Sequence, residues 1–287
     1  MVDAAQELAR QMLADYDART PGQLFGEPLD LTTVQAYALQ AEIARLRQQR
    51  GERVIGYKVG CTSPAVQQQL GIGEPIFARI FDTGCFPCGA TLSYRCYANL
   101  AVEGELAVRL GQAVSAPSGG VDECRAAITS VFPVIELHHY MLRSPQPSLA
   151  ELIASGGMHA GFVLAEEEPE VGLPDLESLS VWIDDQRMGM VAGADVTGLA
   201  VRSVRWLADR LAEKGLTLAQ GAGRPDRFTV ASLRPETGQQ SGRSRSAVRP
   251  QLGCDWPLKR RSGIDEKSPQ SRHARRRAVR RRAPLCD

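Results

Sequence analysis

The charge of the chain changes sign near residue 220, and this limits the part of the sequence that can fold. Residues 1–220 carry 17 Lys and Arg against 27 Asp and Glu, a formal charge of −10. Residues 221–287 carry 17 against 6, or +11, and beyond residue 240 the chain is rich in Ser, Gly and Pro without apolar periodicity. Because such a segment buries too little apolar surface to offset the entropy of ordering, we predict a disordered basic tail over residues 221–287.

Composition excludes several classes of protein. No apolar run approaches the roughly 20 residues of a membrane-spanning helix, and the N-terminus lacks the basic and apolar parts of a secretory signal. The seven Cys are scattered through a long chain, which is typical of a reducing compartment. Cys85 and Cys88 form one CxxC pair that no second pair or nearby His completes into a zinc site. We therefore expect a cytoplasmic protein without a membrane anchor.

Apolar periodicity predicts helices first and strands afterwards. Residues 4–18 and 33–49 show helical spacing, and residues 199–214 form an amphipathic stretch that ends at Gly215. Between them, β-branched and alternating segments predict strands at residues 54–60, 100–110, 132–137, 161–164 and 179–183. Helices followed by many strands favour an α+β fold over a doubly wound parallel sheet. We divide the chain into a helical region (1–52), a β-rich core (53–220) and the basic tail (221–287).

Three glutamates in apolar strands predict a metal site. Glu103 and Glu105 are two residues apart on one predicted strand, so their side chains project from the same face. Glu136 lies inside a second apolar strand, where an unpaired carboxylate would be strongly unfavourable. A hard divalent cation such as Mg²⁺ offsets this charge, because it prefers carboxylate oxygens. The alternative is a solvated strand edge that carries scattered glutamates.

A lysine and the histidines are further candidates for the site. Lys58 sits in an apolar strand between glycines, where it could pair with a substrate carboxylate or have its pKa lowered by burial and a metal. The alternative is a strand lysine whose tip reaches water. His138 shares a strand face with Glu136, and we expect it to support the site rather than to bind metal. His159 lies in a glycine-rich turn from which it could reach the site.

Several motifs together resemble the fumarylacetoacetate hydrolase superfamily, and within it the 2-keto-4-pentenoate hydratase and 4-oxalocrotonate decarboxylase branch. The resemblance covers about residues 1–220. It is carried by GYKVGCTSPAVQQQLGIGEPIFARIF (56–81), VEGE (102–105), PVIE (133–136), AGFVL (160–164) and the tryptophan helix around 206–208. It implies N-terminal helices followed by a rolled mixed β-sheet, and a homo-oligomer where the roll is complete.

The resemblance also implies a chemistry. Glu103, Glu105 and Glu136 would hold Mg²⁺ or Mn²⁺, and Lys58 would lie in the active site. The substrate would be a small 2-oxo or 2-hydroxydienoate acid of aromatic catabolism, which a hydratase of this branch hydrates through a metal-stabilised enolate. The alternatives are a 4-oxalocrotonate-type decarboxylase and an acylpyruvate hydrolase with His138 or His159 as the general base.

The sequence departs from the resemblance near the expected proton-transfer acid. Thr83 occupies the place of the usual acidic residue, and Asp82 is one position away, where a strand residue faces the other side. Asp82 remains our candidate for proton transfer, together with Lys58 and His159. Ser155-Gly156 stands where the family has an Asp-Asn pair, and Leu100-Ala101 replaces a proline and a basic residue.

The resemblance ends abruptly at about residue 220. Shifting the reading frame by one base near residues 218–221 restores a family-like VVLTGSL segment, so we hypothesise a frameshift in the gene or in its sequencing. The chain as it stands would then lack the C-terminal strands of the roll, with an open sheet edge and impaired activity. A different hypothesis makes residues 243–282 a nucleic-acid-binding arm, but this tail has Arg clusters with a single aromatic residue, Trp256, and no folded nucleic-acid motif.

Overall fold

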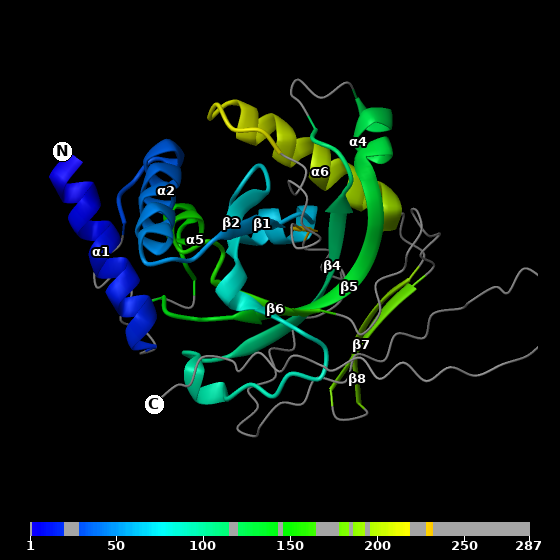
Figure 1. Ribbon diagram of the computed structural model, residues 1–287, viewed down its shortest axis with the longest axis horizontal. Coiled ribbons are helices and arrows are strands. Elements are labelled where there is room, and N and C mark those ends of the chain that lie inside the picture. Colours follow the sequence, from blue (N-terminus) through cyan, green and yellow to red (C-terminus); the bar gives the residue numbers. More distant parts are fainter. Residues whose placement is uncertain are drawn as a thin grey trace, which may run out of the picture. The chain divides into compact units, whose positions relative to one another are not determined.

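The computed structural model describes residues 2–19, 29–114, 120–142, 146–164, 178–183, 186–192, 196–218 and 228–231, drawn in colour in Figure 1. All of them belong to one unit of the chain, Met1–Cys254. No helix among these residues is long and apolar enough to cross a membrane.

Two N-terminal helices pack against each other, α1 (Val2–Ala18) and α2 (Thr33–Gln49). A capping box begins α2, because the Thr32 hydroxyl accepts from the amide of Gln35 and the Gln35 side chain accepts from the amide of Thr32. The short helix α5 (Leu149–Ala154) lies on the other side of α2, as Figure 1 shows. Buried Met12, Leu39 and Leu142 join this helical layer into one apolar cluster.

A mixed sheet of seven strands forms the core, in the order β2-β1-β9-β4-β5-β6-β3. Its strands are β1 (Val54–Gly60), β2 (Ile76–Phe81), β3 (Cys85–Phe86), β4 (Ala101–Leu110), β5 (Ile128–His138), β6 (His159–Leu164) and β9 (Phe228–Ala231). β1 pairs with β9 and β3 with β6 in parallel, and the remaining pairs are antiparallel. The predicted α+β class, with N-terminal helices followed by a mixed sheet, is confirmed.

The amphipathic helix α6 (Val196–Ala212) covers part of this sheet (Figure 1). Its Val204, Leu207 and Leu211 are fully buried against Val108 of β4 and Val131 of β5. Removal of this much apolar surface from water is the main favourable contribution to folding. The helix that we predicted over residues 199–214 corresponds to α6, and its apolar face covers the core on this side of the sheet.

The remaining elements are short. They are α3 (Pro64–Leu70), α4 (Val121–Ala127), the 3₁₀ turns η1 (Asp82–Gly84) and η2 (Tyr94–Cys96), and the hairpin of β7 (Ser178–Ile183) with β8 (Gln186–Ala192). The sequence analysis did not predict α4, α5 or β8. A single helical turn or two carries too few residues to show a period, so tertiary contacts decide its conformation.

Strand β9 lies beyond the predicted end of the fold. Its residues 228–231 pair with β1 on one side and with β4 on the other, inside the sheet. The sheet therefore includes a strand from beyond residue 220. The other tail residues on which we predicted disorder, and the hypothetical nucleic-acid-binding arm, lie outside the described residues.

A buried carboxylate links the helical layer to the turn after β2. Arg47 donates two hydrogen bonds to Glu52, at 3.0 and 2.6 Å, and Arg50 and the Thr83 hydroxyl also bind Glu52. Arg50 further pairs with Asp17 of α1 at 2.6 Å. Burial raises the pKa of Glu52, but the two arginines and Thr83 outweigh this and leave it below its ordinary value.

We expect Glu52→Gln to lower the free energy of unfolding by about 3 kcal/mol at pH 7, because it leaves Arg47 buried without its counter-charge. The folded-state pKa of Glu52 is depressed, so its contribution is present above the unfolded-state pKa and is lost as the pH falls below it. The difference between wild type and variant in urea unfolding should therefore shrink below about pH 4.5. Glu42→Gln, which removes an exposed pair with Arg45, is the control and should change stability by less than about 0.5 kcal/mol.

Candidate active site

Three glutamates meet on one face of the sheet. In the antiparallel ladder of β4 and β5, Glu103 stands directly opposite Glu136, and Glu105 follows two residues along β4. Residues directly opposite each other share a face, as do residues i and i+2. Glu105 and Glu136 are fully buried, whereas the Glu103 side chain is 24% exposed. The sheet therefore concentrates three carboxylates at one place, with Glu103 nearest to solvent.

Lys58 provides the positive charge of the cluster. It lies on β1, and its Nζ forms an ion pair with Glu136 Oε1 although β9 and β4 separate their strands. The lysine is buried, and burial alone would lower its pKa. The charges of Glu136, Glu105 and Glu103 outweigh burial and raise the pKa of Lys58 above its ordinary value. Of the two alternatives that the sequence left open for Lys58, a charged lysine that pairs with a carboxylate agrees with this direction.

Two histidines also bind Glu136. His138 Nε2 lies 2.9 Å from Glu136 Oε2, and His159 Nδ1 lies 2.6 Å from Glu136 Oε1. His159 is the first residue of β6 rather than part of a turn, and it pairs in register with His138. Burial lowers the pKa of His159, although its hydrogen bond with Glu136 acts in the opposite direction. Its Nε2 is buried and has no hydrogen-bond partner among the described residues.

The cluster is short of positive charge. Three carboxylates face one ammonium group, which leaves a formal charge of −2 when all are ionised. Burial, followed by the charge of Glu136, raises the pKa of Glu105 well above its ordinary value. Both Glu105 oxygens are buried, and neither has a hydrogen-bond partner within the described part of the chain. Burying a carboxylate in this way is unfavourable unless a cation lies beside it.

The residues fit a divalent cation. Glu103, Glu136 and His138 each offer a ligand atom, and these atoms lie within 4.8 Å of one another. The unpartnered oxygens of Glu105 add carboxylate ligands beside this group, and oxygen ligands are those that Mg²⁺ and Mn²⁺ accept. The structure thus brings the three predicted glutamates together with Lys58, and adds His138 at the side of Glu136.

Asp82 lies outside these contacts. Its carboxylate accepts from the backbone amide of Arg53 at 2.9 Å and from Arg53 Nε at 2.8 Å. Partial burial raises the pKa of Asp82, but the hydrogen bonds and charge of Arg53 outweigh it and leave the pKa below its ordinary value. Its neighbour Thr83 donates to Glu52 instead. The structure therefore gives Asp82 an ion pair with Arg53 rather than a described contact with Lys58 or the glutamates.

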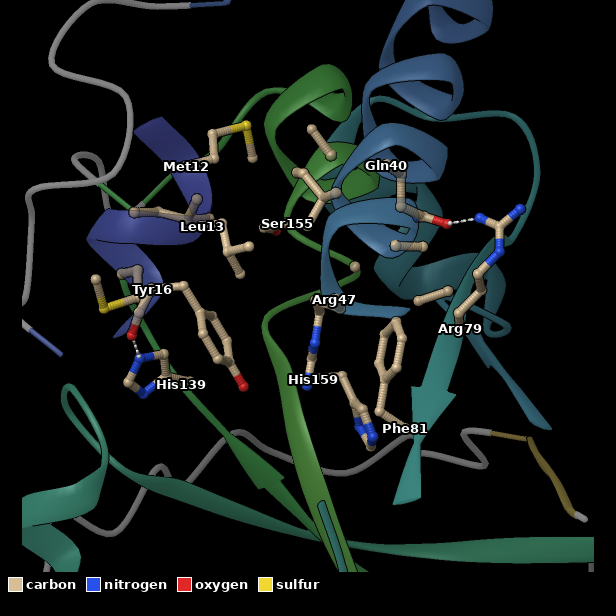
Figure 2. Close-up of a pocket in the computed structure, with 17 residues that line it drawn as sticks. Met12, Leu13, Tyr16, Gln40, Arg47, Arg79, Phe81, His139, Ser155 and His159 are labelled. Carbon is tan, nitrogen blue, oxygen red and sulfur yellow. Dashed lines mark hydrogen bonds between the residues drawn. The ribbon is translucent and has the colours of Figure 1, made fainter. Parts of the chain in front are cut away.

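A cavity of about 60 Å³ adjoins the cluster (Figure 2). His159 forms part of its wall, together with side chains from α1, α2, β2 and the turn after α5. His139 and Tyr16 also line it, and His139 is held by the backbone carbonyl of Tyr16 at 2.9 Å and the amide of Ala98 at 2.9 Å. The sequence analysis placed no helical residue in the site, since no local period marks a residue that contacts a strand far along the chain.

Known proteins are similar to this chain in sequence and in fold. The chain is 27% identical over 208 residues to a 2-hydroxyhexa-2,4-dienoate hydratase of Comamonas testosteroni, covering 71% of this chain and 79% of the relative. It is 29% identical over 188 residues to a 2-keto-4-pentenoate hydratase of Burkholderia vietnamiensis, covering 65% and 72%. No family model matches the chain.

A solved structure extends the likeness to three dimensions. It is 4-oxalocrotonate decarboxylase from Pseudomonas putida G7, complexed with magnesium and adipate, with a TM-score of 0.71, 22% identity and coverage of 81% of this chain and 88% of that chain. The chain has the fold of this decarboxylase. The resemblance to the hydratase and decarboxylase branch is therefore confirmed.

We expect Glu105→Gln and Glu136→Gln to act in opposite directions on the metal-free protein. Glu105→Gln removes an unpartnered buried carboxyl and should raise the free energy of unfolding by about 1–3 kcal/mol. Glu136→Gln removes the partner of Lys58 and should lower it by about 3–5 kcal/mol.

Thermal unfolding with EDTA and with Mg²⁺ measures both effects. Wild type should gain stability with Mg²⁺, because a ligand of the folded state stabilises it, and both variants should lose most of that gain. An equal Mg²⁺-dependent gain in Glu105→Gln would contradict its place beside the cation. Glu151→Gln, a buried cap of α5, is the control and should keep the gain.

Proposed function

We propose that the chain is a divalent-metal-dependent lyase that hydrates a 2-hydroxypenta-2,4-dienoate-type acid. The observation that carries the proposal is the buried cluster of three carboxylates with Lys58, whose excess negative charge suits a divalent cation. The similarity to proteins named as dienoate hydratases supports the same chemistry. The homo-oligomer and the cytoplasmic location implied by the sequence stay predictions.

In this proposal Glu103, Glu105 and Glu136 hold Mg²⁺ or Mn²⁺. When bound, the cation supplies Lewis acidity that stabilises negative charge on the oxygens of a 2-oxo acid. The two fully buried glutamates fix the position of the ligand oxygens, because β4 and β5 are held in register by their ladder. His138 binds Glu136 from the side and orients its carboxylate.

Lys58 and His159 perform the remaining steps. Lys58 remains an ammonium ion because three carboxylates raise its pKa, so it can bind the carboxylate of a substrate that enters the cluster. His159 is neutral in its buried position, and its Nε2 can accept and return a proton while Nδ1 is held by Glu136. Asp82 has no part in the proposal, because Arg53 holds it elsewhere.

A decarboxylase of the 4-oxalocrotonate type is the second candidate. Its specific support is the fold likeness to the solved decarboxylase and 26% identity over 211 residues to a curated one from a Pseudomonas strain. Both reactions need negative charge to be stabilised on the same 2-oxo group, so the cluster serves either. Which of the two reactions occurs depends on the end of the substrate that is remote from the 2-oxo group.

The test is an assay of the full chain with 2-hydroxypenta-2,4-dienoate and, separately, with 4-oxalocrotonate. We expect Mg²⁺-dependent hydration that EDTA abolishes and that Glu103→Ala removes. His159→Gln should lower kcat about 100-fold or more, since general acid–base groups contribute at least this much.

Controls separate chemistry from folding. Lys58→Met should raise KM as well as lower kcat, whereas His159→Gln should lower kcat with little change in KM. Both variants should keep a cooperative thermal transition. Hydration by Glu103→Ala at the wild-type rate, or hydration that persists in EDTA, would refute the metal-dependent mechanism.

A further inference from the structure

The cavity begins beside the reacting groups. Ala78 lines it and stands opposite Lys58 in the β1–β2 ladder, so the two side chains share a face. Gly156 also lines it, and a β-carbon on the next residue, Gly157, would stand 3.8 Å from Lys58 Nζ. On the other side, His159 belongs both to the cavity wall and to the shell of Glu136. A substrate held by Lys58 therefore has the cavity within reach of its other end.

Most of the wall is apolar. Side chains of α1, α2, α5 and β2 and of the segment after β5 supply it, and Figure 2 shows them around a common space. They include Leu13 of α1, Ile43 and Ala44 of α2, Phe81 of β2, and Leu142 after β5. Binding of an apolar group against such a wall is favourable, because the group leaves water. Binding of a charged group is unfavourable there, because nothing replaces the water that it loses.

Two arginines line the cavity, and neither is placed to receive a carboxylate at the end beside His159. Arg47 gives two hydrogen bonds to Glu52, and its guanidinium stacks 3.8 Å from the centre of the Phe81 ring. Arg79 donates to the Gln40 side chain at 3.3 Å, and Figure 2 shows its guanidinium on the Gln40 side, away from His159. The guanidinium of Arg47 is therefore occupied by Glu52, and that of Arg79, which keeps further N–H groups, faces Gln40 rather than the end of the cavity at His159.

The volume of the cavity limits its occupant. Its roughly 60 Å³ is well below the ~150 Å³ of a buried cavity that accepts benzene. An aromatic ring does not fit without displacement of the wall. A hydrogen, methyl or ethyl group does.

We infer that this cavity receives the end of the substrate remote from its 2-oxo acid group, and that it selects a hydrogen or short alkyl group against a second carboxylate or an aromatic ring. The inference rests on the proposed function, since it assumes that the 2-oxo acid end is bound at the glutamate cluster. It assigns the chain to monocarboxylate substrates, and so favours the hydratase over the decarboxylase of a dicarboxylate.

Binding of unreactive saturated 2-oxo acids tests the inference without turnover. Titration calorimetry of the Mg²⁺-loaded full chain would use pyruvate and its straight-chain homologues up to eight carbons. Affinity should rise roughly fourfold per methylene, the value expected for burial of one such group, and should stop rising once the cavity is filled. 2-Oxoadipate, which carries a carboxylate where 2-oxohexanoate has a methyl, should bind at least tenfold more weakly than 2-oxohexanoate.

Substitutions in the cavity wall should change the chain length of the 2-oxo acid at which the affinity stops rising. Ala44→Leu fills the cavity and should shift this limit to shorter acids, whereas Leu13→Ala enlarges it and should shift the limit to longer ones. Ala38→Leu adds the same group to an exposed position of α2 and should leave the series unchanged. If Ala44→Leu fails to fold, Leu13→Ala still decides the test, because Leu13 is only half-buried.

The binding results can contradict the inference about the cavity without contradicting the proposed function. Affinity that is independent of chain length, with pyruvate bound in a Mg²⁺-dependent way, would overturn the inference alone. Tighter binding of 2-oxoadipate, lost in Arg79→Gln, would overturn it in favour of a dicarboxylate held by Arg79. Failure to bind any 2-oxo acid with Mg²⁺ present would contradict the proposed function itself.

Discussion

An excess of buried negative charge is the constraint on which this structure depends. Glu105 and Glu136 have no exposed surface, and Lys58 is their one basic neighbour of permanent charge among the described residues. Burial raises the pKa of Glu136, but Lys58 and the hydrogen bonds of two histidines outweigh it and hold the carboxylate ionised. Burial and the charge of Glu136 raise the pKa of Glu105, and Lys58, which acts in the opposite direction, does not outweigh them. The ionised form of this carboxyl is therefore unfavourable in its buried position, and the divalent cation that we propose would stabilise it.

The sheet is what makes this concentration of charge possible. A strand presents every second side chain to one face, and an antiparallel neighbour presents the residue directly opposite. Two glutamates on β4 and one on β5 thus need only a fixed register to meet. The ladder supplies that register through backbone hydrogen bonds, and α6 packs on the apolar side chains that β4 and β5 present further along, among them Val108 and Val131. The pairing of β4 with β5 therefore both stabilises the fold and sets the geometry of the site.

The local parts of this arrangement could be predicted, and the long-range parts could not. The spacing of Glu103 and Glu105 fixes their common face, and the helical spacing of residues 33–49 predicts α2. By contrast, the contact of His139 with Tyr16 joins residues 123 positions apart, and no local pattern encodes it. The same holds for Gln40, whose amide binds the carbonyl of Ile153. Strand β9 was missed because the surrounding sequence is basic and aperiodic, and only pairing with β1 and β4 makes four residues a strand.

The position of β9 has a consequence for how the protein is made. β1 leaves the ribosome early, whereas its neighbour in the sheet is the last segment of the chain that the structure describes, since Gly56 pairs with Phe228. Pairings across so much intervening sequence form slowly. Until β9 is synthesised, β1, which carries Lys58, and β4, which carries Glu103 and Glu105, each have one unpaired edge. The nascent chain thus passes through a stage in which the strand of Lys58 and the strand of the two glutamates exist but are not joined. Their open edges are the surfaces that chaperones or other nascent chains would meet.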